Sequence, residues 1–128
     1  MSLIYSLIDL TSLNATDTPE SITTLCEKAQ AVAAVCIFPQ FVPLTAQLLK
    51  GTSIKVDTVA NFPQGTDAKE IVLKQIYDAI KQGAEEIDVV FPYHNFFVSL
   101  YLYSLCLNNC KVRRTIWNAD IFYSCFDL

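Results

Sequence analysis

The stretch Ala33-Ala34-Val35-Cys36-Ile37-Phe38-Pro39 is an apolar run that closes on a Phe-Pro pair, and the chain repeats this plan twice. Ile54 to Pro63 and Ile87 to Pro92 end in the same pair, and the successive Phe residues are 24 and 29 positions apart. Near-continuous apolar runs are typical of strands buried on both faces of a parallel sheet. Proline ends such a run because it cannot donate to the ladder. The three runs therefore predict parallel β-strands.

Helical patterns lie between these runs, as crossover connections between parallel strands require. Thr18 before Pro19 predicts a helix N-terminus, because a hydroxyl side chain at the N-cap and proline at the first helical position are both favoured there. The apolar face of this first helix is predicted to contain Ile22, Leu25, Cys26 and Ala29. A second, shorter helix is predicted from Pro43 to Leu49, ending at Gly51.

A third helix is predicted after residue 66. The segment from Asp67 to Glu70 has the pattern of a capping box, and Gly83 stands where a left-handed C-terminal glycine belongs. The predicted apolar face, at spacings of three and four residues, contains Leu73, Ile76, Tyr77 and Ile80.

Alternating strands and helices in units of roughly 25–30 residues fit a (β/α)₈ barrel, whose eight units take about 31 residues each. Doubly wound sheets use similar units, but no G-x-G-x-x-G follows any of these strands, which disfavours the dinucleotide-binding version. The sequence thus predicts an α/β fold, the N-terminal half of a TIM barrel with about four βα units, over residues 1–94.

The pattern changes after residue 94. Residues 95–128 contain every arginine and three of the five cysteines, but neither glycine nor proline. The stretch from Phe96 to Leu105 is uncharged and has high β-propensity, which is an aggregation signature. We expect a divergent tail with no assigned domain, arising either from a shifted reading frame or altered terminus or from a genuine capping segment.

Charge and hydropathy exclude several partners. The net charge is −4, and the six lysines before residue 100 are scattered singly, so a nucleic-acid partner is not expected. The first ten residues lack the features of a signal peptide, and the longest apolar stretch is too short to span a bilayer. An odd count of five cysteines favours reduced thiols. We expect a cytoplasmic protein with no membrane partner.

Asp88 is the sharpest candidate for chemistry, because its carboxylate lies inside a run that should be buried on both faces. Burial of an unpaired carboxylate is costly, so Asp88 is either a capped or ion-paired core residue or a catalytic acid, base or proton relay. Asp57 raises the same question, but Lys55 lies on the same strand face two residues earlier and could neutralise it. For Asp57 the structural ion pair is the favoured interpretation.

Other candidates are weaker. Asp9 and Thr11 stand where an apolar run turns polar, so capping explains them as well as catalysis does. A pair of Cys36 with His94, the single histidine, is conceivable, but nothing nearby in the sequence lowers the pKa of the thiol. Cys106 to Cys110 lacks the paired spacing of a zinc site. We expect neither a metal nor a cofactor.

Four segments in order carry a family resemblance: Asp9 to Asn14, Ala34 to Pro39, Val59 to Gly65 and Gly83 to Tyr93. In this order and spacing they resemble the N-terminal part of deoxyribose-phosphate aldolase. The resemblance covers about residues 5–94.

The resemblance implies a (β/α)₈ barrel and a metal-free class I aldolase that interconverts 2-deoxyribose 5-phosphate with glyceraldehyde 3-phosphate and acetaldehyde. In that family a strand lysine forms a Schiff base with the substrate. By the same resemblance Asp88 is the proton-relay aspartate, and Asp9, Thr11 and Cys36 lie in the pocket for the phosphorylated sugar.

The departures from the family are as informative. Nothing in the sequence resembles the family's segments for the Schiff-base lysine, its lysine partner or the glycine-rich phosphate loops. Lys111 is the one lysine after residue 81, and its context differs from the family's. Lys55 begins a strand, which places it toward the face opposite the catalytic mouth. We therefore expect a truncated aldolase that is inactive alone. The alternative is a non-enzymatic half-barrel that forms a homo-oligomer, binds a partner or aggregates.

Overall fold

The structure is a computed structural model that describes residues 4–92, 114–117 and 120–123. Its sheet has six strands in chain order: β1 (Asp9–Ser12), β2 (Ala34–Ile37), β3 (Lys55–Ala60), β4 (Glu86–Val90), β5 (Arg114–Trp117) and β6 (Asp120–Tyr123). The helices are α1 (Pro19–Lys28), α2 (Val42–Leu48) and α3 (Lys69–Gln82), with 3-10 turns η1 (Tyr5–Leu7) and η2 (Pro39–Phe41). Strands β1 to β4 are all parallel. The predicted βα order of a partial TIM barrel is confirmed.

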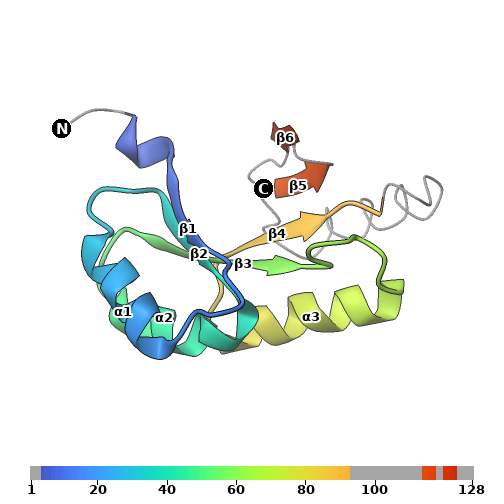
Figure 1. The fold of residues 1–128 in the computed structure, drawn as a ribbon, viewed down its shortest axis with the longest axis horizontal. Coiled ribbons are helices and arrows are strands. Elements are labelled where there is room, and N and C mark those ends of the chain that lie inside the picture. The colour runs from blue at the N-terminus through green and yellow to red at the C-terminus, as the bar shows by residue number, and fades with distance from the viewer. Residues whose placement is uncertain (1–3, 93–113, 118–119, 124–128) are drawn as a thin grey trace.

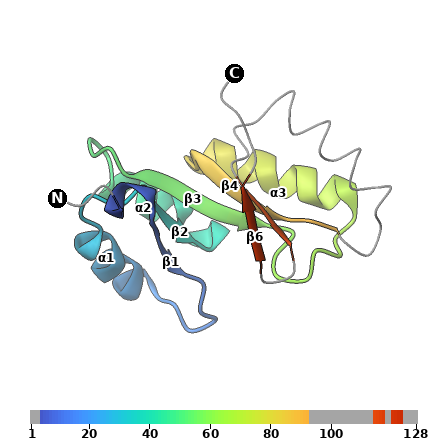
Figure 2. The same cartoon turned by 90° about the horizontal axis from the view of Figure 1, so that it is seen from above.

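The three helices cover one face of the sheet (Figures 1 and 2). The core lies between these two layers and is made almost wholly of aliphatic side chains. Its fully buried members come from both layers: Ile22 and Val42 from α1 and α2, Val72 from α3, and Val35 and Ile37 from β2. This arrangement leaves the other face of the sheet, which would be the interior of a closed barrel, to carry different chemistry.

Helix α1 begins as the sequence predicts. The Thr18 side chain accepts a hydrogen bond from the Ser21 backbone N–H, and the Ser21 hydroxyl accepts one from the Thr18 N–H, so two otherwise unpaired donors are satisfied. Pro19 occupies the first helical position. Ile22 and Cys26 are buried against the core, as predicted.

Helix α3 corrects two predictions. Its N-cap is Ala68, with no side-chain cap, because the Asp67 carboxylate instead accepts a hydrogen bond from Gln75 Nε2 at 2.8 Å. Its buried face contains Val72, Ile76 and Ala79, whereas Tyr77 is 66% exposed. The buried face of the helix is therefore shifted by about one residue from the predicted face.

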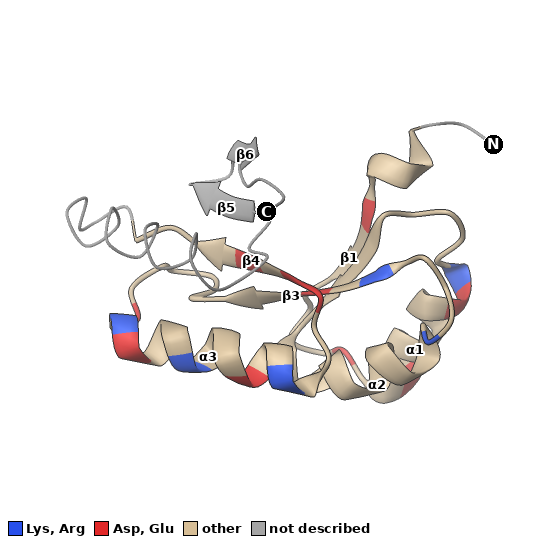
Figure 3. Ribbon diagram, turned by 180° about the vertical axis from the view of Figure 1, so that it is seen from behind, with Lys and Arg blue, Asp and Glu red and all other residues tan. Residues whose placement is uncertain are grey.

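The ends and outer side of α3 fit ordinary helix chemistry. Gly83 has a φ of +112°, and its N–H bonds back to the last turn, so the predicted left-handed C-terminus is confirmed. Basic and acidic residues follow one another along the helix (Figure 3). Lys74 and Asp78 form an ion pair of 2.5 Å on its exposed side. In the described part of the chain, no helix is both long enough and apolar enough to cross a membrane.

Two short strands from the divergent segment join the sheet. β5 pairs with β4 in parallel, with Arg114 in register with Asp88, and β6 pairs with β5 in antiparallel orientation. Neither strand is among those predicted from the sequence. The expected boundary at residue 94 lies outside the described residues, as do His94, Lys111 and three cysteines: Cys106, Cys110 and Cys125.

Candidate functional site

The two faces of the sheet differ in chemistry. Because successive side chains of a strand point to opposite faces, the strand register assigns each residue to one of them. The face toward the helices is apolar and belongs to the core. The opposite face carries a row of polar and thiol groups, in which Thr11 is in register with Cys36, Cys36 with Asp57, and Asp57 with Glu86.

Cys36, Asp57 and Asp88 meet at the centre of this polar face. They come from β2, β3 and β4, and the Cys36 Sγ and one carboxylate oxygen of each aspartate all lie within 4.8 Å of one another. The exposed fractions are 2% for Cys36, 1% for Asp57 and 6% for Asp88. Two of these residues, Asp88 and Cys36, are predicted site residues, and the structure brings them together.

Lys55 does not neutralise Asp57, which corrects the interpretation favoured from the sequence. The Lys55 ammonium instead forms a half-exposed ion pair with Glu85 at 2.6 Å, at the start of β4. No N–H or O–H donor among the described residues reaches either carboxylate oxygen of Asp57. The group that faces this carboxylate is the Cys36 thiol, a weak donor.

Burial sets the protonation of the cluster. Desolvation, with a further contribution from the charge of Asp88, raises the pKa of Asp57 from 3.8 to about 8, although the Cys36 thiol opposes the rise. Desolvation likewise raises the pKa of the Cys36 thiol far above its ordinary value, and the Asp57 and Asp88 charges add to the effect. The thiol is therefore held protonated, which is the opposite of what a cysteine nucleophile needs.

Asp9 and Thr11 are on the same face, toward the edge of the sheet. Asp9 is the first residue of β1, which follows the 3-10 turn η1. Its two carboxylate oxygens are buried, whereas Thr11 is exposed. Thr11 is in register with Cys36, and Asp9 with Ala34, which stands two residues before Cys36 on the same face of β2.

Asn61 organises the loop that follows β3, a role that the sequence did not suggest. This residue is 2% exposed and has a φ of +55°. Its Nδ2 donates to the Val90 carbonyl at 2.7 Å, its Oδ1 accepts from the Asp67 N–H at 2.9 Å, and its own N–H donates to Gln75 Oε1 at 2.8 Å. Asn61 thus ties the ends of β3 and β4 to α3. An asparagine directly after a buried strand was the available signal.

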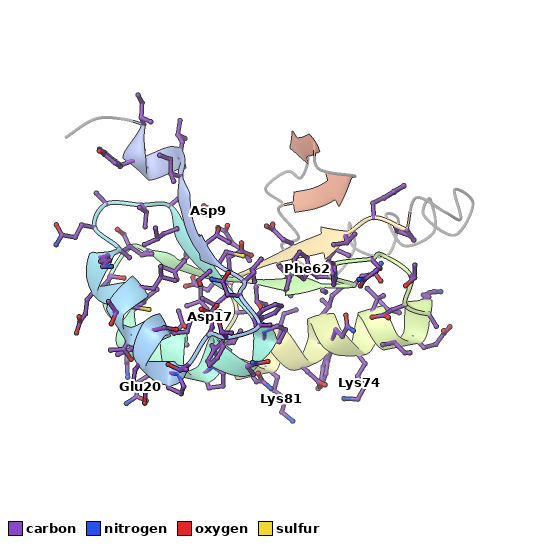
Figure 4. All side chains as sticks on the ribbon, viewed as in Figure 1. Asp9, Asp17, Glu20, Phe62, Lys74 and Lys81 are labelled. Carbon is purple, nitrogen blue, oxygen red and sulfur yellow. The ribbon has the colours of Figure 1, made fainter. Side chains whose placement is uncertain are left out.

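The same loop passes very close to the end of β4. Gly65 has a φ of +69°, and a Cβ at this position would lie 2.8 Å from the Phe91 carbonyl oxygen. Only glycine fits both the conformation and the space. The Phe62 ring of this loop packs edge-on against Phe38, with centroids 5.9 Å apart, so the first two Phe-Pro segments are in contact (Figure 4).

The loop between β1 and α1 is held by Asp17 (Figure 4). Ser12 Oγ donates to both carboxylate oxygens of Asp17, at 3.0 and 2.8 Å, and the Asn14 N–H donates to one of them at 3.0 Å. Desolvation opposes the effect, but these hydrogen bonds, together with one from Ser21, lower the pKa of Asp17. The loop beside the candidate site is therefore fixed by an ionised carboxylate.

Parallel strands in chain order, helices on one face and polar groups on the other define a partial (β/α)₈ barrel. No protein-family profile matches the sequence. Solved structures are more informative, because the chain is similar to deoxyribose-phosphate aldolases over a partial segment of those proteins.

Three of these structures illustrate the similarity. A Coccidioides immitis protein assigned as a deoxyribose-phosphate aldolase is 32% identical, with a TM-score of 0.72 over 77% of this chain and 40% of its own. The tetrameric deoxyribose-phosphate aldolase of Aeropyrum pernix is 25% identical, with a TM-score of 0.70 over 77% of this chain and 43% of its own. The aldolase QR15 is 26% identical, with a TM-score of 0.70 over 80% of this chain and 47% of its own. The chain thus spans less than half the length of these proteins.

Proposed function

We propose that this chain carries one half of a deoxyribose-phosphate aldolase site, for a phosphorylated 2-deoxy sugar, and that it does not catalyse the reaction by itself. The observation that carries the proposal is the buried Asp88 on the polar face of an aldolase-like half-barrel. In the proposed reaction Asp88 moves a proton, as a carboxyl group in a water-poor site can do.

The proposed pocket is formed by the polar face. Thr11 and Cys36 are in register on adjacent strands, and Asp9 lies two residues before Thr11 on the same face of β1. Cys36 serves there as a neutral lining group, since its thiol is held protonated. The Asn61 to Gly65 loop, tied to β4, limits the movement of the sheet beside Asp88.

The proposed inactivity rests on where the lysines lie. Among the described strands, Lys55 is the one lysine, and it is half-exposed at the start of β3 and bound to Glu85. A Schiff-base lysine must reach the catalytic mouth, at the other ends of the strands. The nucleophile of the complete reaction is proposed to come from sequence outside this half-barrel.

The test is borohydride trapping with deoxyribose 5-phosphate, followed by peptide mass spectrometry of the full chain. We expect neither aldolase turnover nor a reduced adduct on any lysine. An adduct on Lys55 or Lys111 that disappears in the matching arginine variant would overturn the proposed inactivity. Trapping of a known class I aldolase under the same conditions is the positive control.

A second candidate function is a non-enzymatic half-barrel that associates with another copy of itself. Among the described strands, β1 lies at the end of the sheet and pairs only with β2, so its outer edge can pair with another chain. Exposed apolar side chains support association: Tyr77 and Ile80 share one side of α3, and Ile4 and Leu7 are exposed beside β1. The Aeropyrum pernix aldolase is itself described as tetrameric.

Light scattering coupled to size exclusion tests this second candidate. Association is expected, and the double variant Ile4→Ser/Leu7→Ser is expected to shift the chain toward the monomer. A monomeric parent chain would exclude self-association.

We also propose a cytoplasmic location. Both described cysteines, Cys26 and Cys36, are free thiols, which suits a reducing compartment. Thiol counting of the freshly purified protein with a chromogenic reagent, after denaturation, tests this proposal. Fewer than five free thiols would count against it.

A further inference from the structure

Three side chains that can ligate metals converge on the polar face of the sheet. Cys36, Asp57 and Asp88 each offer a ligand atom, and these atoms lie within 4.8 Å of one another on three adjacent strands. Strands hold side chains more rigidly than loops do, which favours a site of defined geometry.

The second feature of this cluster is the buried carboxyl group of Asp57. This carboxylate is buried to 99%, and in the part of the chain that the structure describes neither of its oxygens has an N–H or O–H partner. The nearest strand lysine, Lys55, is bound to Glu85 and cannot supply the counter-charge. A buried carboxylate without a donor is costly, and a bound cation removes that cost.

We propose that Cys36, Asp57 and Asp88 form a binding site for a divalent transition-metal ion, with Zn²⁺ as the best-suited ion. One sulfur and two carboxylate oxygens form a donor set typical of such ions, whereas Mg²⁺ and Ca²⁺ prefer oxygen ligands alone. A bound ion would occupy Asp88 and Cys36, which also belong to the half-site proposed above, so the metal-bound chain is a separate state in which Asp88 does not move a proton and the Cys36 thiol is not neutral.

The geometry is compatible with a tetrahedral ion. Bond lengths of about 2.3 Å to sulfur and about 2.0 Å to oxygen place tetrahedral ligands about 3.5 Å apart. The three ligand atoms, at separations up to 4.8 Å, therefore need only small side-chain rotations to close around an ion. Three protein ligands leave the fourth position for water or another molecule.

Protons balance in this binding step. Cys36 binds as a thiolate and Asp57 as a carboxylate, so each releases to solvent the proton it holds in the metal-free protein. No oxidant or reductant is involved.

Cobalt titration tests the proposal, because Co²⁺ replaces Zn²⁺ and its thiolate bond gives a charge-transfer absorption. The full chain is stripped with a chelator and titrated in a background in which Cys106, Cys110 and Cys125 are replaced by serine. We expect one equivalent of Co²⁺ to produce thiolate charge-transfer and tetrahedral d–d bands, and Zn²⁺ to displace it. Cys36→Ser should abolish the charge-transfer band, while Cys26→Ser, another buried cysteine, should leave it unchanged.

The second part of the experiment uses Asp57→Asn, which keeps the shape of the side chain but removes its charge. This variant should weaken Co²⁺ binding by more than about 100-fold, since loss of a direct ligand exceeds the 10- to 100-fold cost of losing an outer partner. Circular dichroism shows that each variant is folded, and a Zn²⁺-induced rise in melting temperature gives an independent readout. Absence of the band in the background chain, its persistence in Cys36→Ser, or unchanged affinity in Asp57→Asn would overturn the proposal. None of these readouts measures aldolase activity, so the two proposals can fail separately.

Discussion

Replacing Asp57 with asparagine should stabilise the protein at neutral pH. In the unfolded chain this carboxyl has a pKa of 3.8, whereas in the folded chain burial and the charge of Asp88 raise its pKa to about 8. Below pH 3.8 both states are protonated and the group is neutral to folding. Above it the unfolded state loses the proton while the folded state keeps it, so folding becomes less favourable as pH rises toward 8.

The expected magnitude follows from this difference. Each pH unit between the two pKa values is worth about 1.4 kcal/mol, which gives a ceiling of about 4 kcal/mol at pH 7. Because local relaxation and water penetration reduce the cost of burying a charged group, about 2 kcal/mol is a reasonable lower figure. The titratable groups that contribute to the shift are Cys36, Asp88, Asp9 and Glu86.

Urea unfolding in the presence of a chelator is the assay. At pH 7 the Asp57→Asn midpoint should exceed that of the parent chain by about 1–2 M, and near pH 4 the two midpoints should coincide. Asp17→Asn is the control, because its effect on stability should have the opposite sign. Hydrogen bonds lower the pKa of Asp17, so this variant should lose stability at pH 7 and approach the parent as pH falls. If Asp57→Asn destabilises the protein equally at both pH values, the account of a buried, repelled carboxyl is wrong.

Three further substitutions test the loops and caps, each by urea unfolding. Gly65→Ala should cost about 1–3 kcal/mol, because its Cβ would lie 2.8 Å from the Phe91 carbonyl oxygen at a positive φ, while Gly51→Ala, which meets nothing within 4 Å, should cost about 1 kcal/mol. Equal losses at the two glycines would show that the close contact is unimportant. Asn61→Ala should cost roughly 2 kcal/mol or more, since it removes a buried donor and acceptor. Unchanged stability would show that Asn61 does not hold the loop in place. Thr18→Ala should cost about 1 kcal/mol through loss of the N-cap, and an unchanged midpoint would contradict the cap seen at α1.

Sequence reasoning was strongest where the signal is local. The Phe-Pro runs located three strands, and Thr18 with Pro19 located the start of α1, because backbone chemistry within a few residues decides both. The predicted buried face of α3 is wrong by one residue. Two apolar stripes run along that helix, and only packing against the sheet selects which of them is buried. The rotation buries Val72 and exposes Tyr77.

The candidate site also combines features that local sequence predicts with features that depend on tertiary structure. Asp88 was identified as a buried carboxylate from its apolar neighbours alone. The contact of Asp57 with Cys36 was not predicted, because it depends on strand register between segments 21 residues apart. Lys55 was assigned to Asp57 by proximity in sequence, whereas the half-exposed Glu85 offers an ion pair without the cost of burying the ammonium. Pairing partners across strands are set by tertiary structure, which a single sequence does not reveal.

The separation of the two sheet faces has a consequence for how this protein can change. Folding depends on the aliphatic layer between strands and helices, and the polar cluster contributes nothing to that layer. Substitutions at Cys36, Asp57 or Asp88 can therefore alter chemistry while the stabilising layer stays intact. Apolar packing and polar chemistry are assigned to alternate positions of the same strands, so a substitution in the polar cluster changes the charge of the site and the pH dependence of folding without removing a contact of the aliphatic core.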